Sequence, residues 1–178
     1  MQESRPYREE LSQYAKLFAA RRKQQLWRDD SLAKVERALF VGFLFVRKLI
    51  EGKKVTDACA RSSTTIGRAP IRRARQVSDF QRDDLIDDLV CVEWTMGKVD
   101  VHQLADKVIH SWWILPARDE GSGLAGFIFT TDRQRNAELW FLPTNSVATV
   151  FRSFGRAAIN SLHKRRDREG RLIYWEAK

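Results

Sequence analysis

The chain has 178 residues, 43% of them hydrophobic and 31% charged, with only 4 prolines and 9 glycines. This composition excludes a disordered or low-complexity chain, and the length suits one domain, residues 1–178, with a sizeable core. The formal net charge of +9 favours anionic partners, such as nucleic acid or an acidic protein.

Cysteine usage and hydropathy point to a cytoplasmic protein. Cys59 and Cys91 form no CxxC pair, which is typical of a reducing compartment and gives no zinc-finger spacing. Charges interrupt the N-terminal segment where a secretion signal needs an apolar run. The longest apolar run, residues 38–46, is far shorter than the roughly 20 residues that span a bilayer. We therefore expect no metal, no cofactor and no membrane partner.

Positive charge is concentrated in two parts of the chain. Residues 1–82 carry 19 basic against 9 acidic side chains, residues 83–120 carry 3 against 9, and residues 121–178 carry 10 against 5. The planar guanidinium group of arginine binds phosphate through two parallel hydrogen bonds, so two arginine-rich clusters are predicted to bind nucleic acid. Their members are Arg68, Arg72, Arg73 and Arg75, then Lys164, Arg165, Arg166, Arg168 and Arg171. The alternatives are a solvated surface and an acidic protein partner.

The N-terminal part of the chain, residues 1–52, is predicted to be helical. An incomplete apolar stripe predicts one helix over residues 5–28. A second helix is expected over residues 32–51, with Ser31 as its N-cap and Gly52 as its C-cap. Apolar side chains occupy so much of this second helix that its centre should be buried on nearly all sides.

The middle of the chain is expected to change structure twice. Residues 53–82 lose periodicity and gain Ser, Thr, Gly and Pro, which predicts an irregular or partly extended basic segment. Residues 99–113 regain helical periodicity, with Asp100 as a possible N-cap. Pro116 is expected to stop this helix.

The last part of the chain, residues 114–178, is predicted to be rich in β-structure. Short aromatic and β-branched segments alternate there with turn residues. The expected elements are a hairpin of residues 123–132 and 136–143, a short helix over residues 145–155, and a second hairpin of residues 158–166 and 171–178. The predicted fold is therefore α+β, with N-terminal helices packed on a small antiparallel C-terminal sheet.

His110 is expected near the end of a helix, where a histidine acts either in catalysis or as a helix cap. His110 follows Asp106 by four residues, so on a helix Asp106 is a same-face neighbour able to hold the imidazole in one tautomer. Alternatively, the His110 ring only satisfies the last carbonyl groups of the helix. The sequence leaves both roles open.

A second polar feature lies on the long predicted helix. Glu36 and Arg47 are eleven residues apart, which places them in nearly the same direction on the flank of the apolar face. Charged residues in such a position are usually paired, so we expect the two to fix the packing of the helix. The alternative is that Arg47 reaches toward His110 from the facing helix and forms a composite polar site.

The stretch ADKVIH, residues 105–110, resembles the short motif of HEPN-type domains, in which an arginine and a polar residue precede a histidine at a helix end. Asp106 and His110 match the polar residue and the histidine, whereas Ala105 stands in place of the arginine. The resemblance covers the long helix and this one, less than a third of the chain. It implies a helical RNA-binding or RNA-cleaving module of bacterial toxin and phage-defence systems.

These observations give three hypotheses for the function. The first is an accessory or regulatory protein that binds nucleic-acid phosphates through arginine-rich loops without catalysis, in a bacterial defence or toxin–antitoxin type of system. The second is a metal-independent ribonuclease with His110 as general acid or base, supported by Asp106, Arg47 and Glu36. The third is a protein-interaction subunit, which would expose Trp and Phe side chains.

Overall fold

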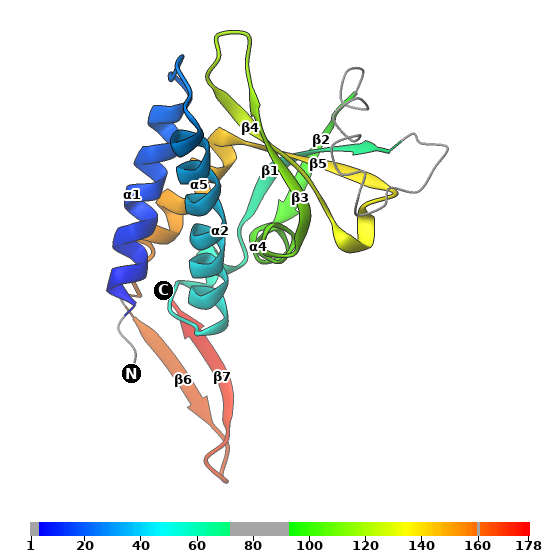
Figure 1. The fold of residues 1–178 in the computed structure, drawn as a ribbon. Helices are drawn as coiled ribbons and strands as arrows, with labels where there is room; N and C mark the ends of the chain where they lie inside the picture. The colour runs from blue at the N-terminus through cyan, green and yellow to red at the C-terminus, as the bar shows by residue number, and fades with distance from the viewer. Residues whose placement is uncertain (1–3, 72–92, 160) are drawn as a thin grey trace.

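The computed structural model describes residues 4–71, 93–159 and 161–178. The fold is α+β, as the sequence predicts. Helices lie beside a five-stranded antiparallel sheet, and a separate two-stranded hairpin extends from the lower end of the helices (Figure 1). The C-terminus returns from the hairpin to the helices (Figure 1).

Three long helices form the helical side of the molecule: α1 (Arg5–Arg21), α2 (Asp29–Glu51) and α5 (Thr144–Arg156). Their core contains Phe43 of α2, which is 0% exposed and whose ring centre lies 5.1 Å from that of Phe151. Gly42 allows this approach, because a Cβ there would collide with the Phe151 ring. The predicted burial of the centre of α2 is confirmed.

The large sheet has the order β2-β1-β5-β4-β3, and every neighbouring pair is antiparallel. Its strands are β1 (Ser63–Pro70), β2 (Thr95–Asp100), β3 (Ser111–Arg118), β4 (Leu124–Thr131) and β5 (Glu138–Pro143). One face buries alternate residues such as Ile66, Phe127 and Trp140 in the same core as the helices. The sheet is therefore a layer against which the helices pack.

Shorter elements complete the fold. Helix α4 (Val101–Ile109) packs against α2 and the sheet, and its N-cap is Asp100, whose carboxylate accepts hydrogen bonds from two backbone N–H groups. The remaining elements are α3 (Asp57–Ala60), the 3-10 helix η4 (Asp132–Gln134), and the strands β6 (Leu162–Arg166) and β7 (Leu172–Ala177). The predicted hairpins β4–β5 and β6–β7 and the predicted helix α5 are confirmed.

Two predicted helix boundaries near the N-terminus are wrong. The first helix ends at Arg21 instead of continuing to residue 28. The second begins at Asp29, with Arg28 and not Ser31 as its N-cap. Two acidic residues, Asp29 and Asp30, then lie in the first turn, where their negative charges interact favourably with the positive end of the helix dipole.

The helix predicted over residues 99–113 is shorter than expected. It ends at Ile109, His110 is its C-cap, and Ser111–Arg118 form strand β3. Pro116 therefore lies inside a strand and does not stop the helix. Proline is tolerated there because β3 is an edge strand of the sheet.

The segment predicted as irregular or partly extended, residues 53–82, has more order than expected in its described part. Residues 63–70 form β1, an inner strand paired with both β2 and β5. Two strands of the sheet thus precede residue 101, so the sheet is not confined to the C-terminal part of the chain.

Candidate functional site

The β6–β7 hairpin carries the second predicted arginine cluster away from the rest of the molecule (Figure 1). Its turn is closed by Asp167, whose carboxylate accepts hydrogen bonds from the backbone N–H groups of Glu169 and Arg171 at 2.9 and 2.8 Å. Gly170 supplies the positive φ of +80° that the turn requires. The hairpin is therefore a well-defined projection with a basic tip.

Cations and aromatic rings face one another across the two strands of the hairpin. Lys164 pairs with Trp175 in the register, and its Nζ lies 4.8 Å from the centre of the ring. Arg165 pairs with Tyr174, which is 49% exposed. Because directly opposite residues share a face of the ribbon, each face presents one aromatic ring beside one cation.

The five basic residues of this cluster differ in their partners. Arg166 donates to the Gly170 carbonyl at 2.6 Å, and Arg171 forms ion pairs with Asp167 and Glu169 at 2.9 and 2.7 Å. These two arginines stabilise the turn. Arg165 and Arg168, in contrast, are exposed and make no ion pair or hydrogen bond with the described residues. They are the cluster's most available guanidinium groups.

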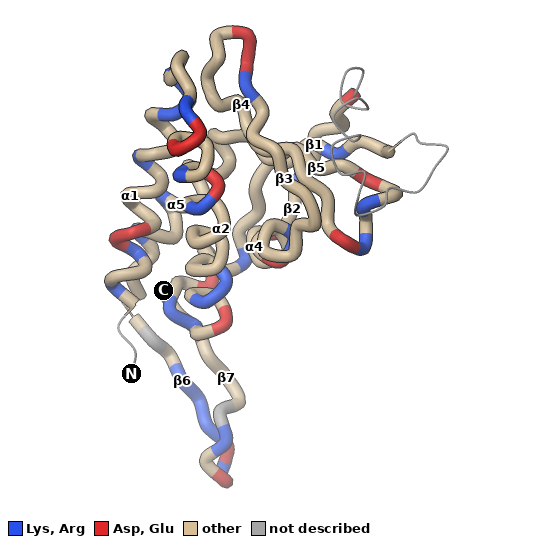
Figure 2. Tube along the Cα trace, viewed as in Figure 1, with Lys and Arg blue, Asp and Glu red and all other residues tan. Residues whose placement is uncertain are grey.

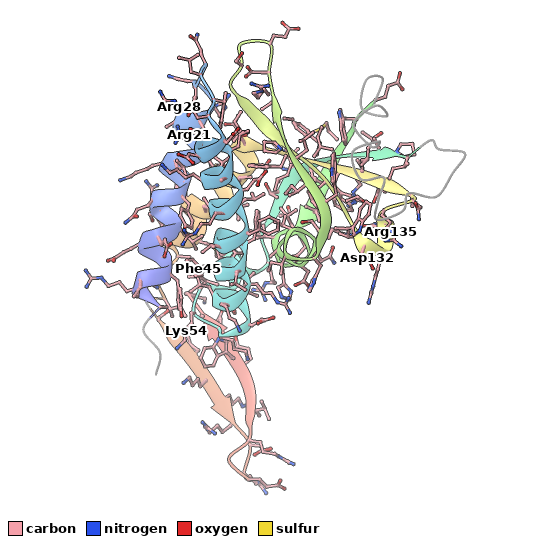
Figure 3. All side chains as sticks on the ribbon, in the orientation of Figure 1. Arg21, Arg28, Phe45, Lys54, Asp132 and Arg135 are labelled. Atoms are coloured by element: carbon pink, nitrogen blue, oxygen red, sulfur yellow. The ribbon has the colours of Figure 1, made fainter. Side chains whose placement is uncertain are left out.

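The base of the hairpin is also basic. Lys53, just after α2, places its Nζ 5.2 Å from the centre of the Trp175 ring, on the residue that Lys164 also contacts. Lys54 lies where the hairpin meets the helices (Figure 3). Asp57 anchors the returning strand, since its carboxylate accepts a hydrogen bond from the Ala177 N–H at 3.3 Å. Positive charge therefore continues from β6 to the lower end of α2 (Figure 2).

The first predicted arginine cluster is only partly described. Arg68 lies on β1, exposed, with its guanidinium carbon 4.4 Å from the centre of the Trp140 ring. Arg72, Arg73 and Arg75 lie outside the described residues. Arg68 belongs to the large sheet, whereas the hairpin extends from the helices, so the structure does not bring Arg68 beside the second cluster (Figure 1).

His110 lies at the end of α4, and its backbone N–H donates to the Asp106 carbonyl at 3.0 Å. Its exposed side chain makes no hydrogen bond or ion pair with the described residues. The Asp106 carboxylate instead faces Arg47, with Oδ1 3.2 Å from Nη1. His110 is thus the C-cap residue by backbone position, without Asp106 orienting its ring.

The predicted pair of Glu36 and Arg47 is not formed. Arg47 reaches Glu51 at 2.7 Å and Asp106 at 3.2 Å, and its hydrogen bond lowers the pKa of the Glu51 carboxyl. Glu36 has no ion pair with the described residues, and burial raises its pKa. The reason is geometric, because eleven residues of helix separate Glu36 and Arg47 by about 16 Å along the axis. The carboxylates within reach of Arg47 are instead one turn further along α2 and on the facing helix α4.

A cavity of about 640 Å³ lies between the C-terminal part of α4, α2 and the η4 turn. It is lined by Arg47, Asp106, Lys107, His110, Thr131, Asp132, Arg133 and Gln134. Arg47 and His110 therefore share one polar site, as the second sequence hypothesis requires. Glu36 is not among the lining residues.

Lys107 also lines this cavity, and a role for it was not predicted from the sequence. Its Nζ donates to the Gln134 Oε1 at 2.9 Å and lies 4.2 Å from the centre of the Trp140 ring, a residue only 2% exposed. Burial, followed by the charge of Arg68, lowers the pKa of Lys107, although the charge of Glu138 opposes this shift. No sequence spacing links these residues, since they meet only through the packing of α4 on the sheet.

Comparison of the chain with known protein families, curated proteins and solved structures gives no match. The resemblance to HEPN-type domains therefore stays a prediction. No helix in the described part of the chain is long and apolar enough to cross a membrane. Within residues 4–71, 93–159 and 161–178, no group of three or more His, Cys, Asp or Glu side chains is placed to hold a metal ion.

Proposed function

We propose that the chain binds nucleic acid through the β6–β7 hairpin, as an accessory or regulatory protein. The observation that carries this proposal is the pairing of exposed cations with aromatic rings on a projecting two-stranded ribbon. In the proposal, Arg165 and Arg168 contact phosphates, and Tyr174 offers its ring to a base. Basic grooves or ribbons with interleaved aromatic residues are a common way to hold single strands.

Single strands suit this surface better than duplexes. A ring such as Tyr174 stacks on a base only where that base is free of its own stack, as in a loop or an unpaired strand. Ile173 (56% exposed) and Tyr174 (49% exposed) are consecutive on β7, so their side chains lie on opposite faces of the ribbon and each face offers one exposed apolar group. The choice between RNA and DNA depends on contacts to the 2′-hydroxyl, so a comparison of RNA and DNA oligonucleotides of the same sequence resolves it.

The burial of aromatic residues argues against the third hypothesis, a subunit with a large apolar docking face. Every Trp and Phe among the described residues is at least partly buried, including those of α2. The large exposed apolar side chains in this part of the chain are scattered over several elements: Leu26, Leu44, Met96, Ile173 and Tyr174. Scattered residues of this kind need no covering partner.

The test is fluorescence anisotropy with labelled single-stranded RNA and DNA of about 12 nucleotides, a length within the usual site sizes of single-strand binders. The double variant R165E/R168E should weaken binding at least tenfold, since two charge-assisted contacts become repulsive. The control K23E/R28E changes the net charge equally at the opposite end of the helices, where Arg28 lies (Figure 3), and should bind like the wild type.

Two further results separate nucleic acid from an acidic protein partner. Tyr174→Ala should reduce single-strand affinity about fivefold or more, because one stacked base is lost. Polyglutamate of matched charge should bind more weakly than the oligonucleotide and should not respond to Tyr174→Ala. Equal weakening by both double variants, or polyglutamate binding as tight as the oligonucleotide, would contradict the proposal.

A further inference from the structure

The cavity beside α4 has more positive charge than its two carboxylates neutralise. Asp106 is paired with Arg47 at 3.2 Å, and Asp132 is paired with Arg135 at 3.5 Å; Figure 3 shows this second pair at the η4 turn. Both carboxylates are thus already engaged. Lys107 and Arg133 line the same cavity and have no ion pair with any described residue.

Lys107 lines this cavity and is held by a hydrogen bond to an uncharged side chain. Its hydrogen-bond partner is the amide oxygen of Gln134, and the Gln134 amide in turn donates to Glu138 at 3.1 Å. Thr131 donates to the same Gln134 oxygen at 3.2 Å, so the amide is fixed from both sides. An ammonium group with three donors therefore keeps donor capacity for a ligand while its position is fixed.

The other donors reach the cavity from separate elements. Arg47 comes from α2, His110 from the end of α4, and Arg133 from η4. Guanidinium forks match the oxygen pairs of a phosphate group, and a lysine ammonium adds a point charge. The cavity volume of about 640 Å³ lies in the range of small-molecule sites, so it has room for more than the phosphate itself.

We infer that this cavity binds a phosphate monoester, with Lys107 and Arg133 as the principal contacts to the phosphate oxygens. The inference goes beyond nucleic-acid binding by the hairpin and does not depend on it. The phosphate group belongs either to a free small phosphomonoester or to the phosphorylated end of a strand. The chemistry of recognition is the same in both cases.

The test is isothermal titration of the full chain with inorganic phosphate, 5′-AMP and adenosine, at constant ionic strength. Phosphate and AMP should bind and adenosine should not, because adenosine lacks the charged group. A 5′-phosphorylated oligonucleotide is compared with its 5′-hydroxyl form. Tighter binding of the phosphorylated form, lost in the cavity variants, assigns the ligand to a strand end, whereas equal binding of the two forms assigns it to a free phosphomonoester.

The chain offers a matched control for the key variant. Lys107→Met and Lys164→Met each remove one ammonium that lies over a tryptophan ring, one in the cavity and one in the hairpin. Lys107→Met should weaken AMP binding about tenfold or more and leave binding of a 5′-hydroxyl oligonucleotide unchanged. Lys164→Met should weaken only the oligonucleotide. This reciprocal pattern separates failure of one proposal from failure of the other.

A second variant tests the same cavity independently, in case Lys107→Met impairs folding. Arg133 is exposed, so Arg133→Ala should keep the thermal midpoint of the wild type while it weakens AMP binding about tenfold or more. The inference is overturned if neither inorganic phosphate nor AMP binds, if adenosine binds as tightly as AMP, or if Arg133→Ala leaves AMP affinity unchanged.

Discussion

Arg47 of α2 lies 3.2 Å from Asp106 of α4, and this ion pair joins the two helices directly before the turn at His110. The sequence spacing alone favours a different contact, between Asp106 and His110. Because Arg47 engages the carboxylate, the His110 imidazole lacks the partner that would orient it as a general base. The pair also places Arg47 on the wall of the cavity that His110 lines.

His110→Asn therefore should have little effect. The side chain is exposed and the cap is made by backbone groups, so we expect a change of less than about 1 kcal/mol in the free energy of unfolding. We also expect no cleavage of labelled RNA by either protein, in a time course at matched purity. Metal-independent cleavage by the wild type, lost about 100-fold or more in His110→Asn, would instead assign a catalytic role.

Phe43→Ala should cost about 3 to 5 kcal/mol of unfolding free energy, because a fully buried ring that contacts Phe151 is removed and a cavity remains. The measurement is a urea titration. Leu44→Ala is the control on the same helix, since Leu44 is 42% exposed and should cost less than about 1 kcal/mol. Equal losses for the two variants would show that the burial of this helix face is misassigned.

Glu36→Gln should stabilise the protein at neutral pH. Burial raises the pKa of Glu36 in the folded state, so the folded chain binds its proton more readily than the unfolded chain, and stability falls as pH rises through this range. Glutamine removes that penalty. Urea titrations should give a gain at pH 7 that disappears near pH 3, where the carboxyl is neutral in both states. The control Glu120→Gln replaces an exposed carboxyl and should change the free energy of unfolding by less than about 0.5 kcal/mol at pH 7.

Cys59 should react slowly with alkylating agents. Burial raises the pKa of its thiol to about 11, which leaves little of the reactive thiolate at pH 8. In a Cys91→Ser background with this single thiol, native protein should react with iodoacetamide at least tenfold more slowly than urea-unfolded protein. Similar rates, followed by mass spectrometry, would contradict the burial of this residue.

The sequence predicted best those elements whose pattern is local. The apolar run of α2 leaves no alternative to a buried helix, and the β6–β7 hairpin follows from the turn residues of DREG between two extended segments. Arginine-rich sequence near this turn also located the basic tip. The sequence could not predict which of these arginines form hydrogen bonds or ion pairs. Arg166 and Arg171 do so only because the folded turn brings Gly170 and Asp167 within their reach.

The errors fall where tertiary contacts override local pattern. The apolar residues after His110 extend the helical periodicity, yet they pair with β4, since Trp113 and Ile114 find partners in Thr130 and Phe129. The strand β1 has few large apolar residues, and its place inside the sheet depends on pairing with β5. The site around Lys107 could not be predicted from the sequence either, because Gln134 and Trp140 approach Lys107 only in the folded chain.

The salt dependence of binding tests the central claim, that the hairpin neutralises nucleic-acid phosphates, most directly. For a single-stranded oligonucleotide, the logarithm of the association constant should fall linearly with the logarithm of salt concentration, by about 0.7 for each phosphate contacted. Removing two contacts with R165E/R168E should make this slope shallower by about 1.4, whereas K23E/R28E should leave it unchanged. An association constant that does not change with salt concentration would contradict this claim. So would an identical salt-dependence slope in the wild type and R165E/R168E.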